Sequence, residues 1–550
     1  MDSVTHTHVC IVGAGPSGLT LANELQRYGV PFELIERRTE RTVDSKAFAL
    51  HARSLEVFRR MGVADAVLAR GLPVAGMAAW AGKRRVLGGD LRLLDSEFPC
   101  VLSIPQADTE AVLLDTLLER GGKVQWGQTL TAVRQNASQA QVDVRDNDGN
   151  TRTIACRWLV GCDGAHSQVR RLINIDWSGD DYDFEFMVAD GNIEWSGDLE
   201  SGHTFLNRQG YVMLFPLPNG RHRIVINVDV GRFSREQLSA DLVNQILQDR
   251  GMGDVKFSHP FWLSSTQGRR RIAGSFKSGR VLLAGDAAHV HSPLGGQGLN
   301  TGIQDAYQLA WRLAAIRNCV EAEHPLLSAY AQERRQVAQE VLKNTDKLTR
   351  LFTARAPLAL LVRNYVIPLL SRRKGFNISL AQTASGVGIR LAQPALALRG
   401  PVNQKLAGTR LVHATINELY AATPVLLGKP QSPAFYEAKR CLAQLRSAST
   451  NTTPRCSLIV TPATEPTLAA WPESLAETRY LDASGSVLQH YGIADAGYLL
   501  VRPDGYVAGG GPLQSAEDLL HNLGVVLHWP STIAASFQQP FATPQQLAEV

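Results

Sequence analysis

Cysteine is scarce in this chain, and its arrangement excludes several classes of site. Seven cysteines occur among 550 residues, their number is odd, and no two stand in a Cys-x-x-Cys pair. A disulfide scaffold, a dithiol redox centre and a zinc cluster all need paired thiols, so none of them is expected. Such usage is typical of a reducing compartment, and we expect a cytoplasmic protein.

Long apolar runs and blocks of one charge are also missing. The most apolar segment, 357–370, is shorter than the roughly 20 residues that span a bilayer, and it contains Arg363. The first apolar run is interrupted by glycines and lacks a basic flank, which argues against a secretory signal. The net charge is only +5, and the basic runs 269–271 and 372–374 are predicted to be solvated surface, so we expect no nucleic-acid partner.

The chain opens with the pattern of a strand, a glycine-rich turn, a helix and a second strand. Apolar runs at 8–12 and 31–36 flank a stretch of helical spacing at 19–28. The turn reads Gly13-x-Gly15-x-x-Gly18. In this dinucleotide fingerprint the first glycine permits a tight turn and the second lets the backbone approach a pyrophosphate. The third lets the helix pack closely on the strand.

A carboxylate follows the second strand where the fingerprint requires one. Glu36 is placed to accept hydrogen bonds from ribose hydroxyls. Because its charge would repel a 2′-phosphate, NADP is disfavoured at this site, and FAD and NAD remain. The predicted cofactor contacts of this unit are Gly13, Gly15, Pro16, Ser17, Gly18, Glu36 and Arg37.

A second segment, 281–302, favours FAD. It reads as a buried strand, a lone acid at Asp286, a glycine-rich turn and a helix that starts at Leu299. A second acid so far along the chain has no role on NAD, whereas the ribityl hydroxyls of FAD need an acceptor. The turn lets the backbone approach a flat ring, and the helix N-terminus favours negative charge there. The predicted contacts of this segment are Asp286, Gly296, Gly298, Leu299 and Asn300.

The alternation of strands and helices stops near residue 175. Strand-like runs such as 210–217 and 223–230 are typical of an antiparallel sheet inserted into the first domain. The predicted architecture is α/β. Its parts are a discontinuous cofactor-binding domain (1–174 and 270–345), a β-sheet substrate domain (175–269), a helical connector (346–395) and a C-terminal domain (396–550).

Three segments together carry a family resemblance. They are the opening fingerprint, the stretch Leu-Val-Gly-Cys-Asp-Gly-Ala-His-Ser-x-Val-Arg at 159–170, and Gly285-Asp286 with its glycine-rich continuation. The set resembles the single-component FAD-dependent aromatic hydroxylases related to p-hydroxybenzoate hydroxylase. It is most similar to their longer branch of phenol, hydroxyphenylpropionate and aromatic-polyketide hydroxylases. This resemblance implies a Rossmann-like FAD-binding domain, an inserted antiparallel-sheet substrate domain and a thioredoxin-like C-terminal domain, whose terminal signature matches 501–508.

The resemblance also implies roles for individual residues. Asp163 would serve both FAD and NADPH, Gln106 would lie near the ribityl chain, and Leu130 would pack near the adenine. Pro293 matches a proline whose carbonyl lies near the flavin ring. Lys46 stands where many relatives have an arginine beside the flavin, and it keeps the charge but loses the planar fork. Lys46 and Pro293 are the candidate catalytic residues.

The implied reaction is a monooxygenation. NADPH or NADH reduces the FAD, oxygen adds at the flavin C4a position, and the resulting hydroperoxide transfers one oxygen to an electron-rich ring. The substrate wall is predicted at 211–215, where period-two alternation puts Tyr211, Met213 and Phe215 on one face. This face has no fixed cation in the sequence pattern, which favours a large phenol or polyketide over a small benzoate.

The sequence leaves several alternatives. Some members of the same family insert oxygen beside a carbonyl in a Baeyer–Villiger reaction, and others inactivate antibiotics. A non-catalytic flavoprotein sensor is the alternative outside enzymes. The expected partners are an aromatic small molecule and O2, with no membrane span and with a homodimer as a possibility. The C-terminal domain lacks a dithiol and would act as a scaffold or a dimer contact.

Overall fold

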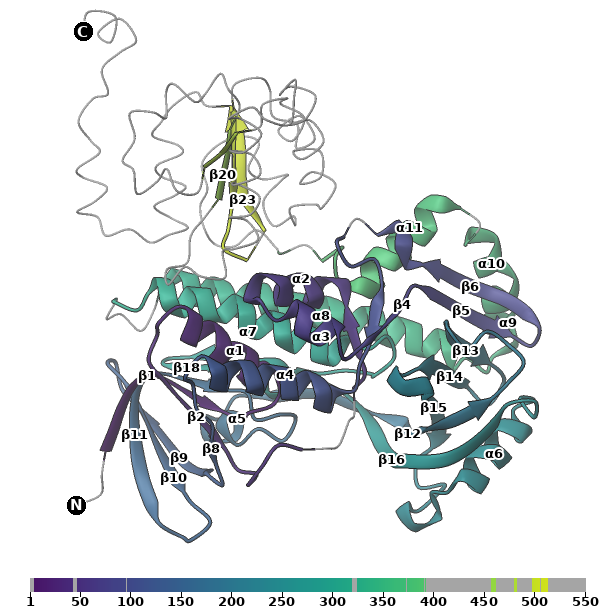
Figure 1. Ribbon diagram of the computed structural model, residues 1–550, viewed down its shortest axis with the longest axis horizontal. Helices are drawn as coiled ribbons and strands as arrows, with labels where there is room; N and C mark the ends of the chain where they lie inside the picture. The colour runs from purple at the N-terminus through teal and green to yellow at the C-terminus, as the bar shows by residue number, and fades with distance from the viewer. Residues whose placement is uncertain are drawn as a thin grey trace, which may run out of the picture. The chain divides into compact units, whose positions relative to one another are not determined.

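The computed structural model describes most of the chain up to Leu391 and four short stretches beyond it (Figure 1). The chain divides into two compact units, of which the first contains residues 1–314 and 320–390. The described residues are 4–42, 47–94, 96–318, 324–371, 373–389, 391, 457–460, 479–481, 497–504 and 506–512.

A largely parallel sheet forms the centre of the part that was predicted to bind the cofactor. Its strands in spatial order are β17 (Lys277–Ser278), β18 (Val281–Leu283), β11 (Thr151–Gly161), β1 (Val4–Val12), β2 (Phe32–Glu36) and β8 (Gln125–Trp126). The strands β18, β11, β1, β2 and β8 run parallel to one another, and the edge strand β17 is antiparallel to β18. The strands β9 (Thr129–Gln135) and β10 (Ala140–Arg145) form a hairpin, and β10 pairs antiparallel with β11. The opening strand, helix and second strand agree with the sequence prediction.

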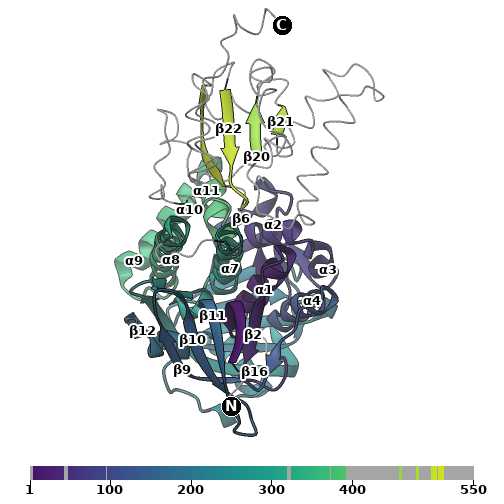
Figure 2. The ribbon, with the colours of Figure 1, turned by 90° about the vertical axis from the view of Figure 1, so that its left-hand side faces the viewer.

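Helices cover this sheet, and their apolar sides pack on it to form a hydrophobic core. Helix α1 (Pro16–Arg27) packs against α4 (Gln106–Glu119), and in both views α1 lies between α4 and α7 (Gln297–Ala315) (Figures 1 and 2). Cys10, Leu21 and Leu25 are fully buried between β1 and α1. The shorter helices are α2 (Ala52–Met61), α3 (Ala64–Leu68) and α5 (Gln168–Leu172), and α8 (Pro325–Phe352) follows α7.

A second sheet of eight strands contains the segment that was predicted to be the substrate domain. Its order is β19 (His289–Val290), β16 (Lys256–Ala273), β12 (Trp177–Glu194), β15 (His222–Asp229), β14 (Tyr211–Pro216), β13 (Gly202–Leu206), β5 (Gly76–Ala81) and β6 (Arg84–Asp90). All neighbours are antiparallel except β13 and β5. Helix α6 (Ala240–Asp249) covers one face.

This sheet is larger than the predicted insertion at 175–269. The hairpin β5–β6 and the short β19 come from segments that the sequence assigned to the cofactor-binding domain. They join because β5 pairs with β13 and β19 pairs with β16, over separations that local periodicity does not encode. A separate three-stranded sheet has the order β3 (Ala49–His51), β7 (Val101–Ser103) and β4 (Leu72–Val74).

Helix α8 runs into the segment 346–395, which was predicted to be a helical connector. Beyond α8 lie α9 (Pro357–Leu361), the π-helical turn η5 (Val362–Val366), α10 (Ile367–Leu370) and α11 (Lys374–Ser385). None of the helices in the described ranges is long and apolar enough to cross a membrane.

The second unit contains a four-stranded sheet in the order β21 (Arg479–Leu481), β20 (Ser457–Val460), β22 (Gly497–Val501) and β23 (Val507–Pro512). The pair β20–β21 is parallel, and the other pairs are antiparallel. Two of the predicted C-terminal strands, near 458–461 and 497–502, agree with β20 and β22. The third, at 425–427, lies outside the described residues.

Candidate functional site

The parallel sheet brings three predicted acids to one edge. Val12 of β1 is in register with Gly161 of β11 and with Ile35 of β2, and Gly161 is in register with Leu283 of β18. Because parallel strands end at the same edge, the residues that follow these strands lie together. The residues at or just after these strand ends are Gly13, Glu36, Asp163 and Asp286, from segments as much as 273 positions apart in the sequence.

The glycine turn after β1 has the geometry of a phosphate cradle. Gly13 has a φ of 105°, and a Cβ there would overlap the Cys162 carbonyl. A Cβ on Gly18 would overlap the Gly13 carbonyl, so both positions need glycine for close packing. A Cβ on Gly15 would meet nothing within 4 Å, which leaves open space in front of the α1 N-terminus. Pro16 is the first residue of that helix, and no side chain caps it.

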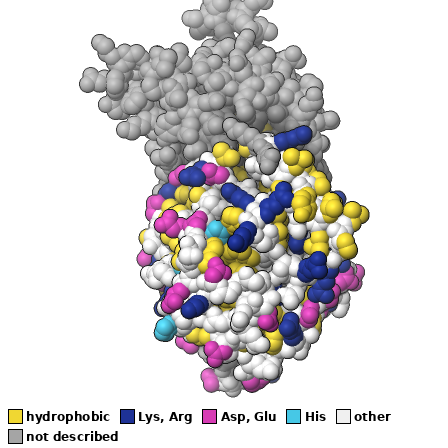
Figure 3. All heavy atoms as spheres, turned by 90° about the vertical axis from the view of Figure 1, so that its right-hand side faces the viewer, with side chains coloured by type: hydrophobic (Ala, Val, Ile, Leu, Met, Phe, Trp, Pro, Cys, Tyr) yellow, Lys and Arg dark blue, Asp and Glu magenta, His cyan; other side chains and the backbone are white. Residues whose placement is uncertain are grey.

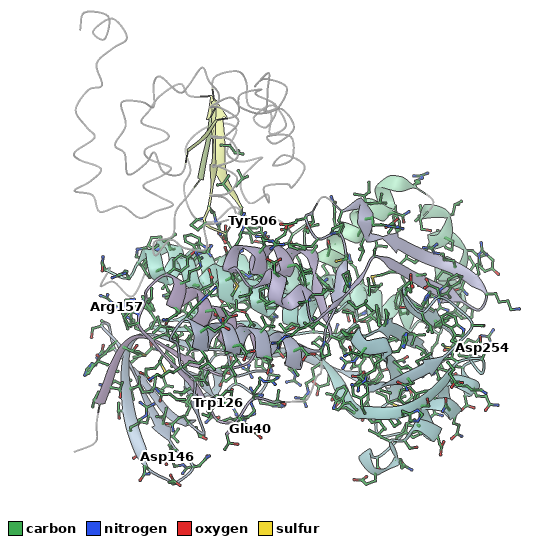
Figure 4. All side chains as sticks on the ribbon, viewed as in Figure 1. Glu40, Trp126, Asp146, Arg157, Asp254 and Tyr506 are labelled. Carbon is green, nitrogen blue, oxygen red and sulfur yellow. The ribbon has the colours of Figure 1, made fainter. Side chains whose placement is uncertain are left out.

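Glu36 is buried and ionised at the end of β2. Its Oε2 accepts a hydrogen bond of 2.7 Å from the Ala14 N–H, and its Oε1 accepts from the Arg38 N–H and Nε, both at 3.1 Å. Burial alone would raise the pKa of this carboxyl, but the bonds from Ala14 and Arg38 lower it below its ordinary value. The adjacent β8 residue Trp126 is in register with Glu36, and its position is labelled in Figure 4.

Asp163 presents one buried oxygen without a partner. Its Oδ2 accepts hydrogen bonds from the backbone N–H groups of Gln168 at 2.6 Å and Val169 at 3.1 Å. Its Oδ1 is buried and has no hydrogen-bond partner. Burial raises the pKa of this carboxyl despite those bonds. This Oδ1 lies at the same edge of the sheet as the glycine turn. A cofactor that carries hydroxyl groups would supply the missing hydrogen bond.

Asp286 projects outward from a short helical turn. Its side chain is exposed, whereas its neighbours Gly285 and Ala287 are buried. Gly285 has a φ of 63°, and a Cβ on it would crowd Ser17. A Cβ on Gly302 of α7 would lie 2.5 Å from the Ser17 Oγ. Ser17 therefore sits where β18, α7 and α1 converge.

A buried ion cluster fixes the turn that carries Asp286. The carboxylate of Asp305 accepts from the Gly285 N–H at 3.0 Å and from Arg334 Nε at 2.5 Å, and it contacts His289 Nε2 at 2.8 Å. All three side chains are fully buried. Burial would raise the pKa of Asp305, but Arg334 and His289 hold it below its ordinary value.

The sequence prediction missed this cluster. In α8, Arg334 pairs with Asp305 and Glu333 pairs with Arg312, and all four side chains lie in the interior. Charged residues at helical spacing are usually exposed, so the sequence alone does not indicate that these are buried. Only the contact between α7 and α8 makes these charges internal.

The glycine loop at 293–300 is held against β3. Gly295 and Gly296 have φ values of 87° and 62°, and the Gly296 N–H donates to the Pro293 carbonyl at 2.9 Å. Asn300 donates to the carbonyls of Ala49 and Gly296 and accepts from the His51 N–H. Its side-chain amide is thus used in positioning the loop. The residues Gly298 and Leu299, partly exposed, lie in the first turn of α7.

The remaining predicted contacts surround this edge. The Gln106 Oε1 accepts from the Ala47 N–H at 3.3 Å, which places α4 beside the segment that follows Lys46. Lys46 itself lies outside the described residues. Leu130 is buried in β9, shortly after Gln128, whose N–H donates to the Glu36 carbonyl. Arg37 is exposed.

The predicted substrate wall has the expected alternation. Tyr211, Met213 and Phe215 belong to one buried apolar cluster, and the intervening Val212 and Leu214 belong to another beneath α6. The first cluster also contains Leu294 from the glycine loop and Phe352 from α8. The face that was predicted to bind substrate is therefore continuous with the loop predicted to lie beside the flavin.

Two polar groups interrupt this wall. The Tyr211 hydroxyl is fully buried and has no hydrogen-bond partner. Arg223, directly opposite Phe215 on β15, forms a bidentate pair with Asp190 at 2.6 Å and stacks over Phe48. The expectation of no fixed cation was wrong, because the cation comes from the neighbouring strand. The paired Asp190 neutralises it.

The comparison with known families decides the assignment. The FAD binding domain family matches residues 6–345. The chain belongs to this family. Members similar to it include 6-methylpretetramide 4-monooxygenase from Streptomyces rimosus, with 36% identity over 364 residues, 64% of each chain. Rifampicin monooxygenase from Streptomyces venezuelae is 36% identical over 348 residues, 63% of this chain and 71% of that one. The first alignment thus spans less than two thirds of the relative.

A solved member of similar length supports the same assignment. The OxyS anhydrotetracycline hydroxylase from Streptomyces rimosus superimposes with a TM-score of 0.72 and 29% identity, over 96% of this chain and 100% of that one. Family membership confirms the predicted FAD cofactor and the resemblance to aromatic and polyketide hydroxylases. The open cradle at Gly15 and the orphan Oδ1 of Asp163 fit a bound FAD.

Proposed function

We propose that the protein is an FAD-dependent, NAD(P)H-consuming monooxygenase that hydroxylates a phenolic or polyketide-like aromatic substrate. The observation that carries this proposal is the apolar cluster that joins the β14 face to the glycine loop through Leu294. This cluster forms a buried wall with aromatic side chains, next to the loop that we expect beside the flavin. The named relatives are monooxygenases, which supports the same reaction.

The cofactor would lie along the carboxyl edge of the parallel sheet. The N–H groups at the start of α1 and the open side of Gly15 would take the pyrophosphate. Glu36 would accept hydrogen bonds from the hydroxyls of the adenosine ribose. Asp163 and Asp286 would accept hydrogen bonds from hydroxyls toward the ribityl end. Bound FAD supplies hydride acceptance from NAD(P)H and the activation of O2 for transfer to an aromatic ring.

Lys46 and Pro293 remain the proposed groups nearest the ring. Pro293 already accepts a hydrogen bond from the Gly296 N–H, so its carbonyl fixes the glycine turn. Lys46 would supply a positive charge one residue before Ala47, whose N–H bonds to Gln106. A cation there stabilises the negative charge of a reduced ring.

The wall residues indicate the substrate class. The rings of Phe48 and Phe215 lie 5.1 Å apart, and Tyr211 meets Phe352 edge to face at 6.2 Å. These aromatic faces suit a fused or substituted ring better than a small carboxylate, because the nearby Arg223 is already paired with Asp190. The unpartnered Tyr211 hydroxyl would donate to a phenolic or carbonyl oxygen of the substrate.

A second candidate is inactivation of an antibiotic by the same chemistry. The similarity to rifampicin monooxygenase favours it. Both candidates, and Baeyer–Villiger insertion, add one oxygen atom, so the structure of the product separates them.

The second unit is proposed to be thioredoxin-like. The mixed four-stranded sheet, with one parallel pair and a terminal hairpin, supports this proposal. Because the sequence has no Cys-x-x-Cys pair, the unit would serve as a scaffold or as a contact in a homodimer.

The test is substrate-stimulated consumption of NAD(P)H together with O2 uptake. The purified holoprotein is incubated under ¹⁸O2 with a panel of phenols, naphthols and aromatic polyketides, and products are analysed by mass spectrometry. The proposal predicts a product that gains one ¹⁸O atom and a matching rise in NAD(P)H oxidation. Slow oxidation that no aromatic compound stimulates would favour a flavoprotein sensor.

A further inference from the structure

The helical segment beyond α8 exposes an apolar stripe. Over α9, η5 and α10 the exposed fractions of Leu358, Tyr365 and Leu369 are 74%, 61% and 63%. Of the thirteen large hydrophobic side chains exposed in the described ranges, seven lie in this segment. The seven are Leu358, Leu361, Val362, Tyr365, Val366, Leu369 and Leu370. We call them the 357–370 face. Their spacing of three and four residues puts them along one side of a helix.

Such a stripe is unusual for a surface bathed only in water. Scattered apolar side chains are normal on proteins, but contiguous ones mark a surface that binds something. Figure 3 shows hydrophobic side chains gathered on the side of the molecule that carries these helices, with Lys and Arg side chains beside them.

Basic side chains border the face. Arg84 of β6 stacks on the Tyr365 ring at 4.7 Å, and its neighbours Lys83 and Arg85 are exposed on the same hairpin turn. Arg208 and Arg355 are exposed on the other border, where Arg355 pairs with Asp229. The packing of α10 against β6 holds the helix flat on the protein, so its long side faces outward.

The sequence around this face is strongly biased in charge. Between Asp346 and Glu418 the chain has eleven Lys and Arg residues and no Asp or Glu. The chain as a whole is nearly balanced, with 56 basic and 51 acidic residues. The apolar stripe therefore lies in the part of the chain with the largest local excess of positive charge.

A groove beside the stripe combines both properties. Its volume is about 680 Å³, and its walls include Pro357, Leu360 and Tyr365 as well as Arg208 and Arg363. Arg363 is only 3% exposed. Among the residues that the structure describes, it donates hydrogen bonds to the Asn364 side chain and the Phe352 carbonyl and to no carboxylate. A buried guanidinium paired only with neutral groups fits an anionic ligand group.

We propose that the 357–370 face docks on the surface of a bilayer that contains anionic phospholipid. An amphipathic helix that lies flat, with an apolar side and basic borders, has the chemistry of an interfacial lipid-binding helix. The leucines would enter the acyl boundary, and the arginines of the border and the groove would meet lipid phosphates. Charge complementarity favours a lipid surface over a second copy of this face, since two copies would bring their basic borders together.

The test is flotation of the full-length holoprotein with vesicles. One set of vesicles is phosphatidylcholine alone, and the other also contains phosphatidylglycerol. The proposal predicts binding to the phosphatidylglycerol vesicles that weakens as salt is raised. The double variant Leu358→Gln/Leu369→Gln is expected to lose about tenfold in partitioning for each leucine. The matched control is Leu118→Gln on α4, whose side chain is 51% exposed, and it should bind like the parent.

Three results would overturn the proposal. The first is that the parent protein fails to float with phosphatidylglycerol vesicles. The second is that the double variant floats as well as the parent. The third is that light scattering shows a dimer for the parent and a monomer for the double variant. The 357–370 face would then be a contact between two copies of the chain. Retained flavin absorbance and NAD(P)H oxidation in the double variant show that it is folded. These readouts do not depend on the proposed substrate, so lipid binding and the proposed function can fail separately.

Discussion

Replacing Arg334 with Met should destabilise the protein more than any surface charge change on the same helix. The Arg334 Nε lies 2.5 Å from the Asp305 carboxylate, and both side chains are fully buried. Without the arginine, Asp305 would keep its bonds to His289 and to the Gly285 N–H but would lose its cationic partner. Removing one member of a buried pair costs about 3–5 kcal/mol, because the other charge stays desolvated.

The matched control is Arg350→Met on the same helix. Arg350 is 70% exposed and pairs with Asp346 one turn away, so its loss should cost about 0.5 kcal/mol or less. The variants are compared by urea unfolding at pH 7, and by FAD titration, since Asp305 also fixes the turn before Asp286. Arg334→Lys should fall between the parent and Arg334→Met. If Arg334→Met is within about 1 kcal/mol of Arg350→Met, the assignment of the cluster as a structural clamp is refuted.

The pair also has a pH signature with a defined sign. Its neighbours hold the pKa of Asp305 below the ordinary value of 3.8. A carboxyl with a lowered folded pKa contributes stability that is complete above its unfolded pKa and is lost as the pH falls through the folded one. The parent should therefore lose stability below about pH 4 more steeply than Arg334→Met does, when unfolding is followed at several pH values.

Three further predictions concern single residues. Gly13→Ala should abolish FAD retention, because a Cβ would overlap the Cys162 carbonyl at a φ of 105°; full flavin occupancy after purification would contradict this. Tyr211→Phe should raise the KM for oxygen-bearing substrates about tenfold and should stabilise the substrate-free protein by about 1 kcal/mol, as measured by steady-state kinetics and urea unfolding. An unchanged KM would argue against a bond to substrate. Burial lowers the pKa of His51 and His291 to about 4, so stability should fall as the pH drops from 6.5 toward 4, and His51→Asn should make this fall shallower.

Much of the cofactor edge could be predicted because its signals are local. The glycines at 13, 15 and 18 stand between an apolar strand and a helix, and Glu36 and Asp286 each follow an apolar strand. Strand polarity then places these carboxyl ends together without any further information. The alternation at 211–215 likewise separates two faces with period two, and the structure shows both faces.

The remaining features depend on contacts between distant segments. Nothing near Arg223 in the sequence indicates that Asp190, 33 positions earlier, neutralises it beside Phe215. The same applies to Asp305 and Arg334, on two different helices, and to the hairpin 76–90, which completes the second sheet. Such pairings follow from tertiary packing and not from periodicity.

The most direct test of the account is FAD affinity in Asp286→Ala. The apoprotein is titrated with FAD and binding is followed by the change in flavin fluorescence, with Asp148→Ala in the exposed β10–β11 turn as the matched control. Loss of a charged acceptor for ribityl hydroxyls should raise the Kd at least about tenfold, and the control should leave it unchanged. A Kd for Asp286→Ala equal to that of the parent would contradict the assignment of the carboxyl edge as the flavin site.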